Sequence, residues 1–244
     1  MNSAKVLQIN SADQLVGLFD HAILHPTITD TEMRVQLQSL RRFPIASVCV
    51  KPYAVRVAVE ALRGTEIAVG TVIGFPHGSS LPEIKAAEAD AAFRDGALDV
   101  DMVVNVGKVL SKDWQFVHAD ISTVLGIARA RSGIIKVIFE TDFLKNDEDK
   151  IRLCEICSDL RVDYVKTSTG FGFVKHGDSY NYLGATEHDV ALMRRYSSTQ
   201  VGVKPSGGVR TLDHVLRMME LGATRIGTAS TEAIYEQAVH RFGR

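Results

Sequence analysis

Cysteine is scarce in this chain of 244 residues, which has only Cys49, Cys154 and Cys157. Three unevenly spaced cysteines cannot build a disulfide framework, so the composition favours a reducing compartment and we expect a cytoplasmic protein. Cys154 and Cys157 form a C-x-x-C pair, but no second pair or nearby histidine completes a zinc site. The apolar spacing around this pair predicts the buried face of a helix instead.

The sequence also lacks an excess of charge of either sign and has no long apolar run. Its 28 Lys and Arg residues nearly balance 29 Asp and Glu residues, giving a formal net charge of -1. This balance excludes the broad positive field that attracts nucleic acids or anionic membranes. No apolar stretch approaches the ~20 residues of a transmembrane helix. We therefore expect no nucleic-acid or membrane partner, and any anion site must be local.

No low-complexity tract or linker rich in Pro, Gly and Ser divides the chain, so the sequence predicts one domain over residues 1–244 with a short N-terminal helical extension. Short β-branched runs alternate with stretches of helical period. The eight runs are FDHAIL from 19, ASVCV from 46, IAVGTVI from 67, LDVDMVV from 98, IIKVIF from 134, VDYVK from 162, VGVK from 201 and TRIG from 224.

Eight strand–helix units in about 250 residues are typical of a (β/α)8 TIM barrel of the α/β class. A doubly wound sheet usually has fewer strands and a glycine fingerprint after the first strand, which is missing here. Three helix starts are predicted from polar residues ahead of apolar periods: Ser80 in a capping box with Glu83, then Thr186 and Thr211.

Charged residues recur where the apolar runs end, which is the face where such barrels carry their active sites. The candidates at the carboxyl ends of predicted strands are Lys51, Asp101, Glu140, Lys166 and Lys204. Any one of them could be an ordinary solvated strand end, but several together favour a site. Lys136 lies near the start of its run, so we expect it at the opposite rim, exposed to solvent.

Lys166 and Lys204 end successive strands, which would place them about 5 Å apart if those strands are neighbours. Two ammonium groups that close disfavour each other's charge, and burial adds to the effect, so one of them should have a lowered pKa. A free amine of this kind forms Schiff bases, and the resulting iminium allows aldol chemistry without a metal. Asp101 could move protons for this amine or serve as a counter-ion.

Two glycine-rich turns suggest where an anion would bind. Ser206-Gly207-Gly208 follows the seventh run, and Gly227-Thr228-Ala229-Ser230 follows the eighth, ahead of a helix. Loops in these positions form the usual phosphate site of a barrel, although either turn alone is weak evidence. Thr169-Gly170 and Arg210 lie nearby in the sequence. We assign no metal to His21, His25 and His77, because no ligand spacing supports one.

Two segments, residues 165–170 (VKTSTG) and 202–208 (GVKPSGG), closely resemble the deoxyribose-phosphate aldolase family. The likeness covers nearly the whole chain through FDHAILHP, VCVKPYAV, VIGFPHG, DVDMVVNVG, KVIFET, GATEHDVALMRR and LGATRIGTAS. It implies a class I aldolase without metal or cofactor that reversibly cleaves 2-deoxy-D-ribose 5-phosphate to acetaldehyde and D-glyceraldehyde 3-phosphate.

The resemblance also implies roles for individual residues. Lys166 would form the Schiff base, Lys204 would lower its pKa, Asp101 would relay protons, and Asp20 would support that relay. The residues around the phosphate and sugar would be Thr169, Gly170, Gly207, Gly208, Gly227 and Ser230. Two other readings stay open: an aldolase of this family with a different donor or acceptor aldehyde, and a phosphate-binding barrel without turnover. Whether the chain forms a homo-oligomer also stays open.

The chain departs from the family pattern at three places. Ala22 and His25 stand where many relatives have Thr and Lys, and Ala229 replaces a common Ser in the phosphate turn. The segment 173–183 (FVKHGDSYNYL) is longer than the short loop usual at this position. With Lys175, His176, Tyr180 and Tyr182, it is predicted either to cover the site or to contact another subunit, unless it is a tolerated surface insertion.

Overall fold

Eight parallel strands form the centre of the fold in the computed structural model, which describes residues 9–244. Their spatial order is β10-β1-β2-β3-β4-β5-β6-β9, and a bridge between Ser206 and Gly227 brings the segments after β9 and β10 together. The predicted (β/α)8 barrel is confirmed, and each predicted run overlaps one of its strands. They are β1 (Phe19–Ile23), β2 (Ser47–Val50), β3 (Ala68–Ile73), β4 (Asp99–Val103), β5 (Ile134–Ile138), β6 (Tyr164–Lys166), β9 (Gly202–Lys204) and β10 (Ile226–Thr228).

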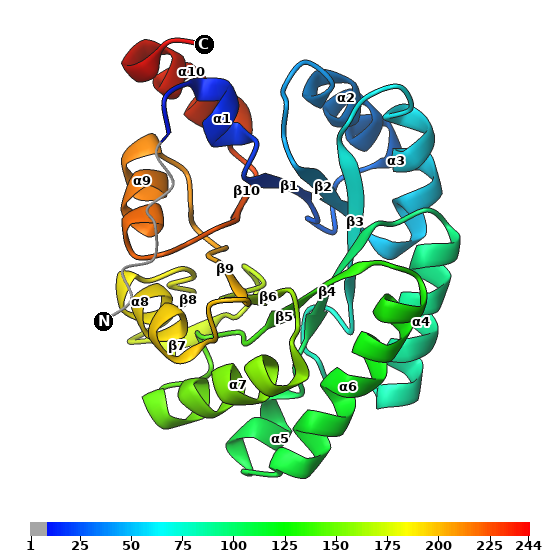
Figure 1. Ribbon diagram of the computed structural model, residues 1–244, viewed down its shortest axis with the longest axis vertical. Coiled ribbons are helices and arrows are strands. Elements are labelled where there is room, and N and C mark those ends of the chain that lie inside the picture. The colour runs from blue at the N-terminus through cyan, green and yellow to red at the C-terminus, as the bar shows by residue number, and fades with distance from the viewer. Residues whose placement is uncertain (1–8) are drawn as a thin grey trace.

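Helices surround this sheet on its outer side (Figure 1). They are α2 (Asp30–Leu40), α3 (Val55–Ala61), α4 (Pro82–Arg94), α5 (Val106–Leu110), α6 (Trp114–Ala130), α7 (Asp147–Leu160), α8 (Glu187–Tyr196), α9 (Leu212–Glu220) and α10 (Thr231–Phe242), with a 3-10 turn at Pro52–Ala54. A short helix, α1 (Ala12–Val16), precedes β1 and packs against α10. No helix in the described part of the chain is long and apolar enough to cross a membrane.

Two of the three predicted helix starts are confirmed. The side chains of Thr186 and Thr211 accept hydrogen bonds from the first turns of α8 and α9. The predicted capping box of Ser80 and Glu83 is wrong, because α4 begins at Pro82 with Leu81 as its N-cap. Proline fits the first helical position and holds the residue before it extended, so it moves the start of the helix past Ser80.

The main core lies between the barrel and the helices. All four residues of β2 and all five of β4 are buried. Fully burying a Val, Leu, Ile or Phe side chain stabilises a fold by roughly 1.5–3 kcal/mol, so this layer is the principal stabilising element. Cys154 and Cys157 are buried on α7, as the sequence predicts, and burial raises the pKa of the Cys154 thiol to about 12.

The inserted segment 173–183 is a β-hairpin outside the barrel sheet. Its strands β7 (Val174–His176) and β8 (Ser179–Asn181) pair in antiparallel fashion. Gly177 has a φ of +60 in the two-residue turn between them, a backbone conformation that glycine adopts without strain. The hairpin joins β6 to α8, so it follows the strand that ends in Lys166. The side chain of His176 lies outside the part of the structure that is described.

Candidate active site

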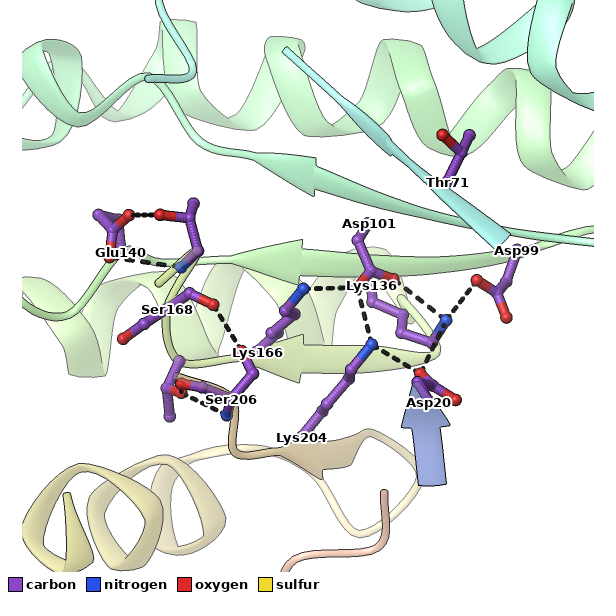
Figure 2. Close-up of polar contacts among 12 residues, drawn as sticks. Asp20, Thr71, Asp99, Asp101, Lys136, Glu140, Lys166, Ser168, Lys204 and Ser206 are labelled. Atoms are coloured by element: carbon purple, nitrogen blue, oxygen red, sulfur yellow. Dashed lines mark hydrogen bonds and ion pairs between the residues drawn. The ribbon is translucent and has the colours of Figure 1, made fainter. Parts of the chain in front are cut away.

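Lys166 and Lys204 lie side by side in the barrel. They end β6 and β9, and the two residues are direct partners in the parallel ladder. Each Nζ donates a hydrogen bond of 2.7 Å to the same oxygen, Oδ2 of Asp101 (Figure 2). The two nitrogens are therefore no farther apart than twice that distance. Both residues are buried, with 4% of Lys166 and 1% of Lys204 exposed.

Asp101 lies in the middle of β4, so the prediction that it sits at a strand end is wrong. Its side chain is fully buried and faces the nitrogens of both lysines in the interior of the barrel. Residues two apart in a strand face the same way, which explains why Asp99 of the same strand shares this interior.

Lys136 also lies inside the barrel, which overturns the expectation that it is solvated at the opposite rim. It is 1% exposed, and its Nζ lies 2.6 Å from Asp99, 3.1 Å from Asp101 and 3.3 Å from Asp20. Sequence reasoning missed Asp99, Lys136 and also Arg225, which lies 3.4 Å from Asp20. A signal was present, because charges of opposite sign inside apolar runs must be paired when buried.

Two carboxylates of this cluster, Asp101 and Asp20, keep their charge, whereas burial raises the pKa of Asp99. Burial opposes ionisation of Asp101, but Lys136, Lys166 and Lys204 outweigh it and hold its pKa well below the usual range. Burial is likewise outweighed at Asp20, whose pKa is lowered by Lys136, Lys204 and Arg225. Lys204 lies 2.6 Å from Asp20 as well as beside Asp101. These two carboxylates outweigh burial and raise its pKa, so Lys204 remains an ammonium.

A cavity of about 170 Å³ opens above this charged floor. It is lined by Asp20, Lys166 and Lys204 and by most of the residues predicted around a phosphate and sugar: Thr169, Gly207, Gly208, Gly227 and Ser230. Tyr182 and Arg210 line it too. Gly170 does not join them, because it lines only a neighbouring cleft. The structure thus brings the predicted site residues together, with Gly170 at their edge and Asp101 beneath them.

Backbone atoms form the wall of this cavity at the place where the two glycine-rich turns meet. Gly207 and Gly208 have φ values of +88 and +77, and a Cβ added to Gly227 would come within 2.6 Å of Ser206. Among the described residues, no side chain caps the N-terminus of α10, which follows Ser230 directly. A helix N-terminus beside turns without side chains suits an anion, because N–H groups can approach it closely.

Thr169 is held by a buried carboxyl group at the end of β5. Its hydroxyl donates a hydrogen bond to Oε2 of Glu140 and accepts one from the Phe171 backbone N–H at 2.9 Å. Glu140 has a φ of +46, a strained conformation for a residue with a side chain. Burial raises the pKa of Glu140 to about 7, with a smaller contribution from Asp142. Glu140 therefore positions Thr169 at the cavity wall.

A larger cleft of about 1190 Å³ adjoins the cavity and shares Ala22, Leu24, Thr169, Tyr182, Ala229 and Ser230 with it. Two of the family departures, Ala22 and Ala229, therefore lie where the two spaces meet. His25, which departs from the family pattern together with Ala22, lines the cleft but not the cavity. The rest of the cleft is mostly apolar, including Ile28, Leu40, Phe43, Phe171 and Phe173.

The remaining candidates lie away from the charged floor. Lys51 follows β2, as predicted, but its Nζ donates to the backbone oxygen of Ile28 at 2.7 Å and does not line the cavity. His21 is buried and bonded to Thr231, and burial lowers its pKa to about 4. His77 is exposed. Within residues 9–244 there is no group of three or more His, Cys, Asp or Glu residues that could hold a metal ion.

Comparison with known proteins agrees with this geometry. The model of the DeoC/LacD family aldolase matches residues 15–237. Proteins named deoxyribose-phosphate aldolase are similar over most of their length. The one from Rhodopirellula baltica is 42% identical over 93% of this chain and 90% of its own, and the one from Listeria monocytogenes is 44% identical over 90% and 94%. A tetrameric deoxyribose phosphate aldolase from Aeropyrum pernix superimposes with a TM-score of 0.81 at 25% identity, over 94% of this chain and 92% of its own.

Proposed function

The chain belongs to the DeoC/LacD family of aldolases and is a carbon–carbon lyase, and from this premise we propose that Lys166 forms the Schiff base through which it cleaves 2-deoxy-D-ribose 5-phosphate. The products are acetaldehyde and D-glyceraldehyde 3-phosphate, and the reaction is reversible. One observation carries this assignment: two lysine nitrogens meet on one carboxylate oxygen at the floor of a cavity walled by glycine-rich turns.

Both lysines line the cavity, and Lys166 is the nucleophile because it pairs with a single carboxylate, Asp101, within residues 9–244. Lys204 has two carboxylate partners and a raised pKa, so it supplies the fixed positive charge. The amine of Lys166 attacks C1 of the open-chain sugar, and loss of water leaves an iminium ion.

The iminium then acts as an electron sink. The bond between C2 and C3 breaks, its electron pair forms the enamine, and the C3 hydroxyl gives up its proton as glyceraldehyde 3-phosphate departs. Protonation of C2 and hydrolysis release acetaldehyde and restore Lys166. Asp101 touches both lysine nitrogens, so it is suited to passing protons between them, and Asp20 holds Lys204 in place.

The phosphate is assigned to the two turns that contain Gly207, Gly208, Gly227 and Ser230, which line the same cavity as the lysines. Backbone N–H groups and the N-terminus of α10 supply donors there. Ala229 offers no hydroxyl, so this site relies more on backbone donors than one with a second serine. Thr169 faces the sugar, but its hydroxyl proton is directed at Glu140.

The proposal also covers the oligomeric state and the cellular location of the protein. We assign a homo-oligomeric state, supported by the tetrameric relative from Aeropyrum pernix. We assign a cytoplasmic location, supported by three buried cysteines that are all free thiols. Light scattering after gel filtration tests the first assignment, since a single protomer mass would contradict it.

The activity is tested by following glyceraldehyde 3-phosphate release with an NADH-coupled dehydrogenase. The wild-type chain should cleave 2-deoxy-D-ribose 5-phosphate, and Lys204→Ala should lower kcat by about 10²–10³-fold, the usual cost of removing a fixed group that stabilises charge in the transition state. Lys51→Ala is the matched control, because this lysine lies outside the cavity, and it should retain kcat. Absence of cleavage by the wild type, or an unaffected Lys204→Ala variant, contradicts the proposal.

A further inference from the structure

The hairpin β7–β8 is fixed at both of its bases by carboxyl groups from the loop after β5. At its start, Glu140 holds Thr169. At its end, Asp142 accepts hydrogen bonds from the backbone N–H groups of Leu183 and Gly184, the latter at 3.0 Å. The inserted segment is therefore tied down at the mouth of the barrel, beside the strand that ends in Lys166.

The end of the hairpin also abuts the turn assigned to the phosphate. A Cβ added to Gly184 would lie 2.4 Å from the backbone oxygen of Gly207, and Ala185 N–H donates to that same oxygen at 3.0 Å. Such close approach leaves no room for the hairpin to shift without moving the turn. A residue at this end of the hairpin therefore has a fixed position relative to the phosphate site.

Tyr182 is that residue. Its half-buried ring packs edge-on against Phe173 at the opposite base of the hairpin, with ring centroids 5.6 Å apart. It lines both the 170 Å³ cavity and the 1190 Å³ cleft, so its ring stands where the two spaces adjoin. Its hydroxyl oxygen accepts a hydrogen bond of 3.4 Å from Nη2 of Arg210, which also lines the cavity.

We propose that Tyr182 determines acceptor specificity: its hydroxyl keeps the Arg210 guanidinium at the phosphate end of the cavity, and its ring closes the cavity against the apolar cleft. This inference rests on the proposed aldolase function and assigns a role to the inserted hairpin. A guanidinium held in place loses less conformational freedom when it pairs with a phosphate oxygen. The cleft beyond the ring suits an apolar or aromatic aldehyde rather than a sugar phosphate.

The test compares kcat/KM for 2-deoxy-D-ribose 5-phosphate with that for unphosphorylated 2-deoxy-D-ribose. Tyr182→Phe and Tyr182→Ala should each lower this ratio about tenfold, mainly through KM, because each removes one hydrogen bond to a charged group. In the synthetic direction, with acetaldehyde as donor, Tyr182→Ala should gain about tenfold in kcat/KM for 3-phenylpropanal. Tyr182→Phe should not gain, since its ring still closes the cavity.

Tyr180→Ala is the matched control, because Tyr180 lies on β8, is 69% exposed and lines neither space. It should keep the parent ratio and the parent thermal midpoint. The inference is overturned if both Tyr182 variants keep the parent ratio, or if Tyr180→Ala changes it equally, which would indicate damage to the hairpin. Borohydride trapping of acetaldehyde in Tyr182→Ala separates this failure from failure of the proposed function. If an adduct forms on Lys166, the aldolase function holds and only the inference about Tyr182 fails.

Discussion

The described part of the chain contains several clusters of buried lysine and aspartate, and two of them behave differently. Outside the barrel, Lys85 of α4 and Asp120 of α6 form a fully buried pair at 2.6 Å. Burial outweighs the single partner there: it lowers the pKa of Lys85 and raises that of Asp120. Inside the barrel, Asp101 faces three lysines, and their charges outweigh burial, so its pKa falls well below the usual range. Asp99, which pairs with Lys136 alone among the described residues, has a raised pKa. The number of lysines in direct contact therefore decides whether a buried carboxylate of this cluster stays ionised.

The two clusters also differ in what they can reach. Lys85 is enclosed between helices, and its Nζ donates to the backbone oxygen of Val103 at 2.9 Å, so it joins α4, α6 and the end of β4. Inside the barrel, Lys166 and Lys204 end their strands at a cavity. Burial and pairing are common to both clusters, whereas only access to a cavity makes chemistry available. We therefore expect the outer pair to matter for stability and Lys166 to matter for turnover.

Lys166→Ala should have the largest effect in the molecule, and that effect should be on turnover. Loss of the nucleophile should lower kcat/KM by at least roughly 10⁴-fold, as expected when a covalent catalyst is removed. The fold should persist, because Asp101 keeps Lys136 and Lys204 as partners. Coupled assays and thermal unfolding measure the two quantities. If Lys166→Ala keeps a tenth of wild-type activity, Lys166 does not have the catalytic role that sets it apart from the Lys85–Asp120 pair.

Lys85→Ala should show the reverse pattern. Removing this lysine leaves Asp120 buried without its partner, which should lower the free energy of unfolding by about 3–5 kcal/mol while the folded fraction keeps its kcat. Arg56→Ala is the control, because the Arg56–Asp95 pair is exposed and should contribute less than about 1 kcal/mol. Urea titration measures both. Equal losses in the two variants would show that burial of the pair has no consequence.

Glu140→Gln should have a smaller effect that depends on pH. The pKa of Glu140 rises from 4.5 to about 7 in the fold, so between these values the native state holds a proton that the unfolded state has lost. The stability contributed by the protonated carboxyl is full below pH 4.5 and declines as pH rises through 7, by on the order of 3 kcal/mol in total. Glu140→Gln should remove this decline.

Urea titrations at several pH values test this expectation, with Glu155→Gln as the control for loss of an exposed carboxylate on α7. Parallel stability curves for the wild type and Glu140→Gln would contradict the raised pKa. This outcome also bears on the comparison of the two lysine–aspartate clusters. Burial is the largest influence on the pKa of Glu140, as it is on that of Asp120, and the charge of Lys166 has only a small effect.

The sequence predicts the barrel and the pairing of its two central lysines for a simple physical reason. Buried parallel strands are near-continuous apolar runs, and a charge that ends a run marks the strand end. Lys166 and Lys204 follow that rule. Lys136 breaks it, because its long side chain extends inside the barrel to carboxylates on β1 and β4. Which way a strand residue points depends on register, and a short run does not fix the register.

From the sequence, the hairpin could be recognised only as a segment, 173–183, that is longer than the loop usual at this position. A Gly-Asp turn between two short polar runs is a hairpin signal, but strands of three residues give little periodicity to read. The contact of Tyr182 with Arg210 joins segments 28 residues apart and depends on how the hairpin is anchored. The family resemblance also contained no counterpart for this segment. Its position over the site therefore required the structure.

The central claim is that the amine of Lys166 is the nucleophile. Incubating the wild-type chain with acetaldehyde and sodium borohydride, followed by peptide mass spectrometry, tests it most directly. We expect one reduced two-carbon adduct, on the peptide that contains Lys166, and none on Lys204 or Lys136. An adduct on Lys204 instead, or no adduct under conditions where the enzyme turns over, would contradict the account.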